Sequence, residues 1–129
     1  MRFGDRHSYR WVVFTGVAGI YFGFGVVATS LAPIVSEVRT DLSLSRSAVG
    51  LALGAWQFVY IATAPAAGRF VDRFGLKWSL TIGALVVILS GLARSAAGDL
   101  LSLWLAVALF GVGGPLISSC APTSAALWF

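Results

Sequence analysis

The sequence predicts an all-α fold, a polytopic transmembrane helical bundle. Of its 129 residues, 58% are hydrophobic and 11% are charged, against about 25% charged residues in an ordinary soluble domain. The apolar residues fall into four long stretches, each long enough to cross about 30 Å of hydrocarbon as a helix. A soluble domain of this length needs a larger polar surface than so few charged side chains provide. The lipid bilayer is therefore the expected surrounding.

The polar residues exclude several other classes of protein. The net charge of +4 resides almost entirely between the apolar stretches, without a basic stripe of the kind that binds nucleic acid. Cys120 is the single cysteine, so neither an internal disulfide nor a cysteine-rich metal site is expected. No paired carboxylates, metal-ligand cluster or serine–histidine–aspartate set falls at membrane depth. We predict no enzyme activity, no metal, no cofactor and no nucleic-acid partner.

The first predicted elements are an N-terminal segment at 1–10 and transmembrane helix one at 11–35. The segment carries Arg2, Arg6 and Arg10, which in front of an apolar run could imitate a secretory signal. The run has no charge over its whole length, however, whereas the apolar region of a cleaved signal has about 7 to 15 residues. We therefore predict a membrane helix that is retained.

Three further transmembrane helices are predicted at 48–67, 78–97 and 100–128. Polar connectors separate them, and Ser45 or Ser47 is expected to cap the second helix. The last stretch is longer than a perpendicular span needs, which favours tilt or a bend.

The distribution of Lys and Arg predicts the orientation of these helices. The segments 1–10 and 68–77 hold six such residues, and they lie on the same side of the membrane if the helices alternate. The opposite side holds three, Arg39, Arg46 and Arg94. We predict a multi-pass protein of the cell membrane with a cytoplasmic N-terminus.

Glycines spaced four residues apart occur in the first two predicted helices. Gly19 and Gly23 form one pair, and Gly50 and Gly54 form another. Such pairs give a helix a smooth face that a neighbouring helix can approach closely. We expect both faces to pack against other helices.

The connector at 68–77 carries the most specific pattern, Gly-Arg-Phe-Val-Asp-Arg-Phe-Gly-Leu-Lys. It resembles the signature that major facilitator transporters carry between their second and third helices: a glycine, an Asp-Arg pair, another glycine and then basic residues. Leu76 stands where the family often has a second basic residue. Five residues match, and we call them the latch motif: Gly68, Asp72, Arg73, Gly75 and Lys77.

The chemistry of the latch motif fits this resemblance. Gly75 can turn the chain, Asp72 can meet the N-terminus of a helix, and Arg73 can donate several hydrogen bonds. The resemblance implies that the motif stabilises one access state by contacting the second half of the transporter. The alternative interpretation is a charged loop that serves only the orientation of the helices.

The resemblance also implies the architecture and the activity. The four helices would belong to a twelve-helix fold that moves a small-molecule solute, with or without a coupling ion, by alternating access. The first, second and fourth helices would line a central cavity, and the missing C-terminal helices would be needed, so we expect the chain to be an N-terminal fragment. The alternative is a small membrane scaffold or assembly subunit without transport activity.

The fourth stretch carries a weaker resemblance in the run from Gly111 to Pro122. Proton-coupled drug antiporters of the superfamily usually have an arginine four residues before the first of these glycines, where this chain has Val107. The Gly-Gly-Pro run is more similar to the branch that moves small anions and organic acids, such as cyanate, nitrate or monocarboxylates. Pro115 and Pro122 either bend this helix or free backbone carbonyls for a binding site.

Neutral polar residues within the spans are the candidates for a solute path. Gln57 and Tyr60 share a helix face, and a mid-span glutamine is costly unless a watery cavity or a partner helix satisfies it. The alternative for each residue is a hydrogen bond to a neighbouring helix or to its own backbone. The candidates are Gln57, Tyr60, Tyr21, Thr29 and Ser118.

Overall fold

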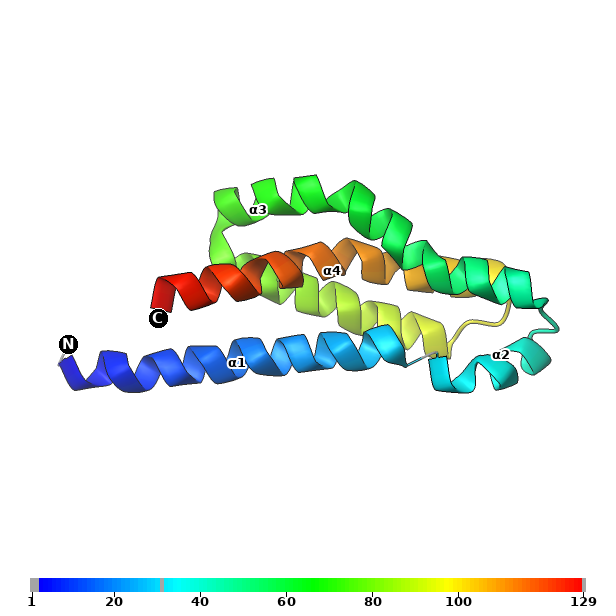
Figure 1. Ribbon diagram of the computed structural model, residues 1–129, viewed down its shortest axis with the longest axis horizontal. Coiled ribbons are helices and arrows are strands. Elements are labelled where there is room, and N and C mark those ends of the chain that lie inside the picture. Colours follow the sequence, from blue (N-terminus) through cyan, green and yellow to red (C-terminus); the bar gives the residue numbers. More distant parts are fainter. Residues whose placement is uncertain (1–2, 31, 129) are drawn as a thin grey trace.

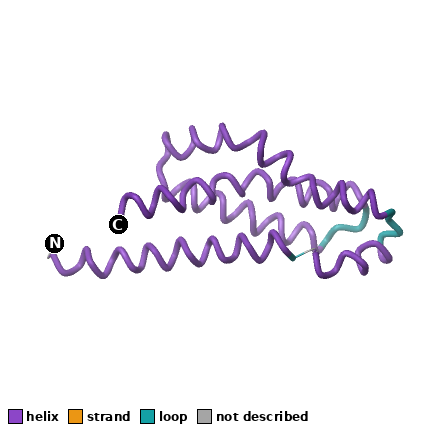
Figure 2. The backbone as a smooth tube through the Cα atoms, in the orientation of Figure 1, coloured by secondary structure: helices purple, strands orange, loops and turns teal. Residues whose placement is uncertain are grey.

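The described part of the chain, residues 3–30 and 32–128 of a computed structural model, is helical almost throughout (Figure 1; Figure 2). The elements are α1 (Phe3–Thr29), the short 3-10 helix η1 (Ala32–Ile34), α2 (Val35–Asp41), α3 (Arg46–Ser95) and α4 (Leu100–Trp128). Within this part there is no strand, and α1, α3 and α4 are long and apolar enough to cross a membrane. The predicted all-α transmembrane bundle is confirmed.

Helix α3 folds back on itself at Gly75. This residue has φ 80° and ψ 171°, a conformation that glycine adopts without the clash a side chain would cause. Figure 1 shows the result as two arms, which we call the first arm (46–74) and the second arm (76–95). The polar connector predicted at 68–77 is therefore helical on both sides of a single turning residue. Both arms of α3 continue as helix into the polar connector, and the helical backbone satisfies its own hydrogen bonds there. A loop of several residues is therefore not needed.

Helix α1 extends further toward the N-terminus than the predicted helix at 11–35, and it also ends earlier. The Thr29 hydroxyl donates to Gly25 O at 3.0 Å, and the Ser30 hydroxyl donates to Val27 O at 2.9 Å. These bonds occupy carbonyls at the end of the helix, and Pro33 is poorly suited to continue it. The chain then turns into η1 and α2.

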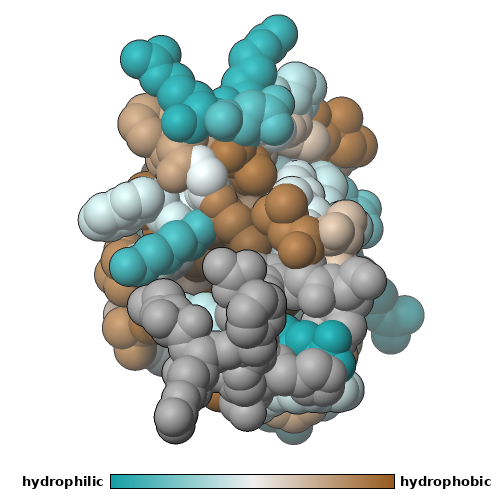
Figure 3. Space-filling view, turned by 90° about the vertical axis from the view of Figure 1, so that its left-hand side faces the viewer, coloured by the Kyte–Doolittle hydropathy of each residue, from teal (hydrophilic) through white to brown (hydrophobic). Residues whose placement is uncertain are grey.

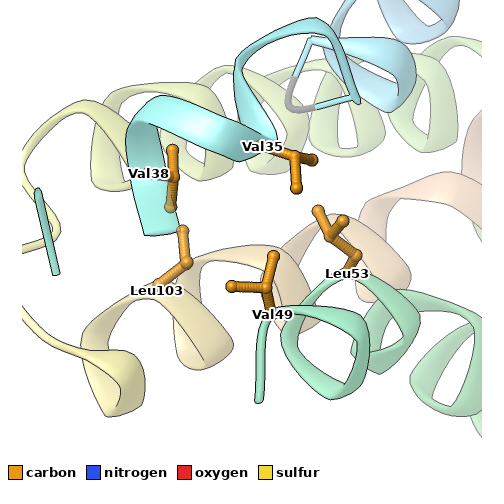
Figure 4. A pocket seen from close by; sticks show the side chains of 5 residues that line it. All are labelled: Val35, Val38, Val49, Leu53 and Leu103. Atoms are coloured by element: carbon orange, nitrogen blue, oxygen red, sulfur yellow. The ribbon is translucent and has the colours of Figure 1, made fainter. Parts of the chain in front are cut away.

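Helix α2 lies in the segment predicted as a polar connector, and it packs through apolar side chains. Figure 4 shows Val35 and Val38 of this region facing Val49 and Leu53 of α3 and Leu103 of α4. Val38 of α2 thereby packs against the buried cluster that α3 and α4 form at this end of the bundle. Polar residues of α2 remain exposed, which explains why the composition alone indicated a loop.

Serine and aspartate caps begin the two long helices that follow. Ser45, one of the two predicted candidates, accepts a hydrogen bond from Ala48 N at 3.1 Å and caps α3. At α4, Asp99 Oδ1 accepts from Ser102 N at 2.7 Å, while Asp99 N donates to Ser102 Oγ at 3.1 Å. This reciprocal pair has the form of a capping box.

Helix α4 is the central helix of the bundle. It contacts both arms of α3 and also α1, and its fully buried side chains include Phe110, Ile117 and Val107. Small residues allow this approach: a Cβ on Gly111 would overlap Trp56 O and lie 2.8 Å from Val59 Cβ, whereas one on Gly113 would lie 3.0 Å from Gly83 O.

The glycine pairs singled out in the sequence are not the contact points. A Cβ added to Gly19, Gly23, Gly50 or Gly54 would meet no atom within 4 Å in the described chain. The expectation that these faces pack against other helices is not met among the helices seen here. The spacing identifies a smooth face, but it does not say which side of the helix faces a neighbour.

Substitution of Gly111 by alanine is predicted to destabilise the bundle. The new methyl group would overlap the backbone of the first arm, so α4 must move away, at a cost of about 1 to 3 kcal/mol. The measurement is the free energy of unfolding in mixed detergent micelles, followed by circular dichroism. Gly50→Ala, which meets open space, is the control. Equal stability of the two variants would contradict the close packing at Gly111.

The cap of α4 is predicted to depend on pH. Hydrogen bonds from the Ser102 side chain, and then from its backbone, lower the pKa of Asp99. A lowered pKa in the folded state means that the cap stabilises the helix above the ordinary pKa of about 4 and is lost as the pH falls through the lowered value. Amide exchange protection in the first turn of α4 should therefore fall in acid for the native chain. Asp99→Asn should remove this pH dependence, and an unchanged profile in that variant would count against the cap.

Candidate functional site

A cleft of ≈ 350 Å³ opens between α1, the first arm of α3 and α4. No residue of the second arm lines it. The side chains around it are mostly aromatic or neutral and polar. They are Tyr21, Phe24, Trp56, Gln57, Tyr60, Ile61 and Ser118.

The cleft brings together four of the five candidates predicted for a solute path. Tyr21 comes from α1, Gln57 and Tyr60 come from the first arm, and Ser118 comes from α4. Thr29 is not among them, and its hydroxyl is bonded to carbonyls of its own helix. The residues of the first arm lie within five positions of one another, so they occupy neighbouring sides of one helix turn.

A direct hydrogen bond crosses the floor of the cleft. Tyr60 Oη and Ser118 Oγ are 2.6 Å apart, and Ser118 Oγ also lies 3.3 Å from Pro115 O. Either hydroxyl can be the donor in the bond between Tyr60 and Ser118. Both side chains thus join α3 to α4 and still line the cleft.

An aromatic cluster supports the same region. The Phe24 and Phe110 rings stack with their centroids 4.8 Å apart, and Trp56 meets Phe110 edge-on at 5.5 Å. A side chain on Gly114 would lie 3.0 Å from the Tyr60 ring and 3.2 Å from the Phe24 ring, so this glycine makes room for them. Sequence reasoning missed Trp56 and Phe24. The available signal was a tryptophan in the middle of a span, away from the headgroup region that indoles favour.

Pro115 lies inside α4, and its missing N–H affects the hydrogen bonds of that helix. The carbonyl four residues earlier, Gly111 O, loses its helical donor. Thr63 Oγ1 of the first arm lies 3.1 Å from Gly111 O and 2.8 Å from Val59 O of its own helix, so the two carbonyls share its single proton. Near Pro115 a shared hydroxyl therefore joins two helices.

Arg94 ties the end of α1 to the rest of the bundle. Its Nη1 donates to Val27 O at 2.6 Å and to Ser30 Oγ at 3.3 Å, and its guanidinium lies 5.1 Å from the centre of the Phe110 ring. The sequence indicated only a positive charge near the membrane boundary. The structure shows an interhelical contact on the helix that supplies Tyr21 and Phe24 to the cleft.

The latch motif lies away from the cleft, at the bend of α3. Asp72, Arg73 and Lys77 are exposed there, and the Arg73 guanidinium lies 5.6 Å from the Phe74 ring. Figure 3 views this end of the bundle, where hydrophilic side chains project above and beside hydrophobic ones. The structure thus separates the two predicted groups of functional residues, one at the end of the bundle and one between its helices.

Comparison with known proteins gives one family and several transporters. The family model described as Major Facilitator Superfamily matches residues 13–129. "Uncharacterized transporter YycB" of Bacillus subtilis (strain 168) is 30% identical over 80% of this chain and 25% of that protein. "Multidrug resistance protein MdtH" of Yersinia pestis (strain Pestoides F) is 36% identical over 75% of this chain and 23% of that protein.

A further relative is "Multidrug resistance protein 1" of Bacillus subtilis (strain 168), 32% identical over 57% of this chain and 18% of that protein. The chain therefore spans a quarter or less of the length of these relatives. No solved structure matches it.

Removal of the Thr63 hydroxyl is predicted to weaken the bundle. Thr63→Val removes the hydroxyl that Gly111 O shares with Val59 O, which should lower the free energy of unfolding by about 0.6 kcal/mol. Thr81→Val is the matched control, because that exposed hydroxyl bonds only Lys77 O of its own helix. Unfolding in mixed micelles measures both variants. If Thr63→Val lost no more stability than Thr81→Val, the repair of Gly111 O would contribute nothing.

Proposed function

Because the chain belongs to the Major Facilitator Superfamily, we propose that its helices form part of a secondary active transporter, with the cleft as part of the solute path. Transport would proceed by alternating access, with the solute held near the middle of the membrane. The observation that supports this is the convergence of Gln57, Tyr60, Tyr21 and Ser118 from three helices on one cleft. These helices are those that the sequence resemblance implied for a central cavity.

The position of Gln57 supports a watery path. Its side chain is exposed in the described bundle, and no other side chain of that bundle is recorded as its hydrogen-bond partner. An amide left without partners in hydrocarbon costs several kcal/mol, on the order of 4 to 8. Water or a solute in the cleft would remove that cost. A place for Gln57 in a hydrated transport path therefore explains its exposed amide better than a place in contact with lipid does.

We propose that the latch motif acts when the transporter changes its access state. The exposed Asp72, Arg73 and Lys77 are available to helix ends beyond those of this bundle, and Gly75 fixes the bend that presents them. The start of α1 lies at the same end of the bundle as this bend (Figure 1). With the excess of Lys and Arg there, this arrangement supports a cytoplasmic N-terminus in the cell membrane.

The class of solute is a separate proposal. The sequence predicts a small anion or organic acid, with or without a coupling ion, whereas two of the matched relatives are named multidrug resistance proteins. We propose that helices beyond this bundle complete the path on the open side of the cleft. The transporter that carries this chain is therefore the form in which activity is to be measured.

Replacement of Gln57 by leucine is predicted to weaken transport without unfolding the bundle. Loss of one solute hydrogen bond should raise the KM for uptake about two- to tenfold. Uptake of a panel of radiolabelled anionic, neutral and cationic solutes into proteoliposomes measures this effect. Thr81→Val, on the second arm and away from the cleft, is the control. An unchanged KM in Gln57→Leu for every transported solute would remove Gln57 from the path.

A further inference from the structure

We infer that the cleft between α1, the first arm and α4 binds the positively charged group of an organic solute, such as a substituted ammonium ion. This inference rests on the proposed function and names the chemical class of its solute. It differs from the anion that the sequence predicts. Three properties of the cleft carry it: uncharged lining residues, four aromatic rings and several neutral oxygen acceptors.

None of the seven lining side chains carries a charge. An anion in a membrane cleft needs a cationic partner or several converging donors to replace its hydration. Arg94 is committed elsewhere, to Val27 O and Ser30 Oγ at the end of α1. Any selection by charge that these seven residues make must therefore come from aromatic rings and neutral dipoles.

Four of the lining residues are aromatic: Tyr21, Phe24, Trp56 and Tyr60. The face of an aromatic ring is electron-rich, so it attracts a cation within about 6 Å and repels an anion. Trp56 and Tyr60 meet edge to face with centroids 6.0 Å apart, so their ring planes differ in direction. Rings turned differently around one space are the arrangement that holds ammonium groups.

Two residues that line the cleft have backbone carbonyls without a helical donor. Pro65 lies inside α3 and Pro122 inside α4, and each deprives the carbonyl four residues earlier of its helical donor. Those carbonyls belong to Ile61 and Ser118, and both residues line the cleft.

Pro115 provides the comparison. There the released carbonyl, Gly111 O, lies 3.1 Å from Thr63 Oγ1, a hydroxyl that it shares with Val59 O at 2.8 Å. Among the described residues, no side chain donates to Ile61 O or Ser118 O. The carbonyls released by Pro65 and Pro122 thus differ from the one released by Pro115, and they belong to residues that line the cleft.

The hydroxyl chain points to the same chemistry. Whichever of Tyr60 and Ser118 donates in their mutual bond, each hydroxyl oxygen keeps a lone pair that can accept a further hydrogen bond. The side-chain oxygen of Gln57 is a further acceptor. Neutral oxygen acceptors and aromatic rings can together replace the water oxygens that hydrate a cation.

The test is direct binding to the transporter that carries this chain, in nanodiscs of phosphatidylcholine. Trp56 is kept as the sole tryptophan by replacing Trp11, Trp78, Trp104, Trp128 and any tryptophan of the further helices with phenylalanine, and its fluorescence is followed. The probes are benzyltrimethylammonium and, as an anion of similar size and aromaticity, phenylacetate. The ammonium probe should bind saturably with a Kd at least about tenfold below that of phenylacetate. Empty nanodiscs correct for partition into lipid.

Two kinds of variant test the named groups. Tyr21→Leu should raise the Kd for the ammonium probe about two- to fivefold, while Phe22→Leu, an exposed ring on the same helix outside the cleft lining, should not. Pro65→Ala and Pro122→Ala restore an N–H to the released carbonyls, so they should raise this Kd while leaving helicity unchanged or increased. Pro33→Ala, in η1, is the control for proline loss.

The outcomes separate this inference from the proposed function. Tighter binding of phenylacetate, together with uptake of organic acids, would overturn the cationic class and leave the transport path standing. Saturable binding of neither probe, with uptake unaffected by Gln57→Leu, would overturn both. Proline variants that fold and bind the ammonium probe like the native chain would overturn the role of the released carbonyls.

Discussion

The close approach of α4 to its neighbours is the constraint on which the rest of the structure depends. In lipid, apolar surface gives helices no preference for one another over the acyl chains, so association depends on close packing and on interhelical hydrogen bonds. Gly111 and Gly113 let α4 meet the two arms of α3 at backbone distance. The Gly75 turn brings those arms together, because it reverses the chain within one residue.

The same run of small residues also creates the cleft. Gly114 lies beside Tyr60 and Phe24, and any larger residue would push these rings outward. The glycines of α4 thus act differently according to the neighbour they face. Where they face backbone they permit packing, and where they face aromatic rings they shape an open space.

The membrane helices were predictable from the sequence because length and apolarity are properties of each segment alone. The turn at Gly75 was also predictable, since few residues other than glycine adopt its conformation. The contacts were not, because the spacing of Gly19 and Gly23 carries no information about which face has a neighbour. Tyr21 and Thr29 illustrate the same limit: they share a helical stripe, yet Tyr21 lines the cleft and Thr29 bonds its own helix end. The donor for Gly111 O came from Thr63, 48 positions away, a pairing that only the packed structure defines.

Arg94 connects the packing of the bundle to the shape of the cleft. Helix α1 contributes Tyr21 and Phe24, but its contacts with α3 and α4 are far fewer than those between α3 and α4. The Arg94 guanidinium joins its last turn, at Val27 O, to the second arm, and its contact with Phe110 extends to the ring stacked on Phe24. The side of the cleft formed by α1 is thus positioned by a residue that does not line it, through two hydrogen bonds of its guanidinium and two aromatic contacts.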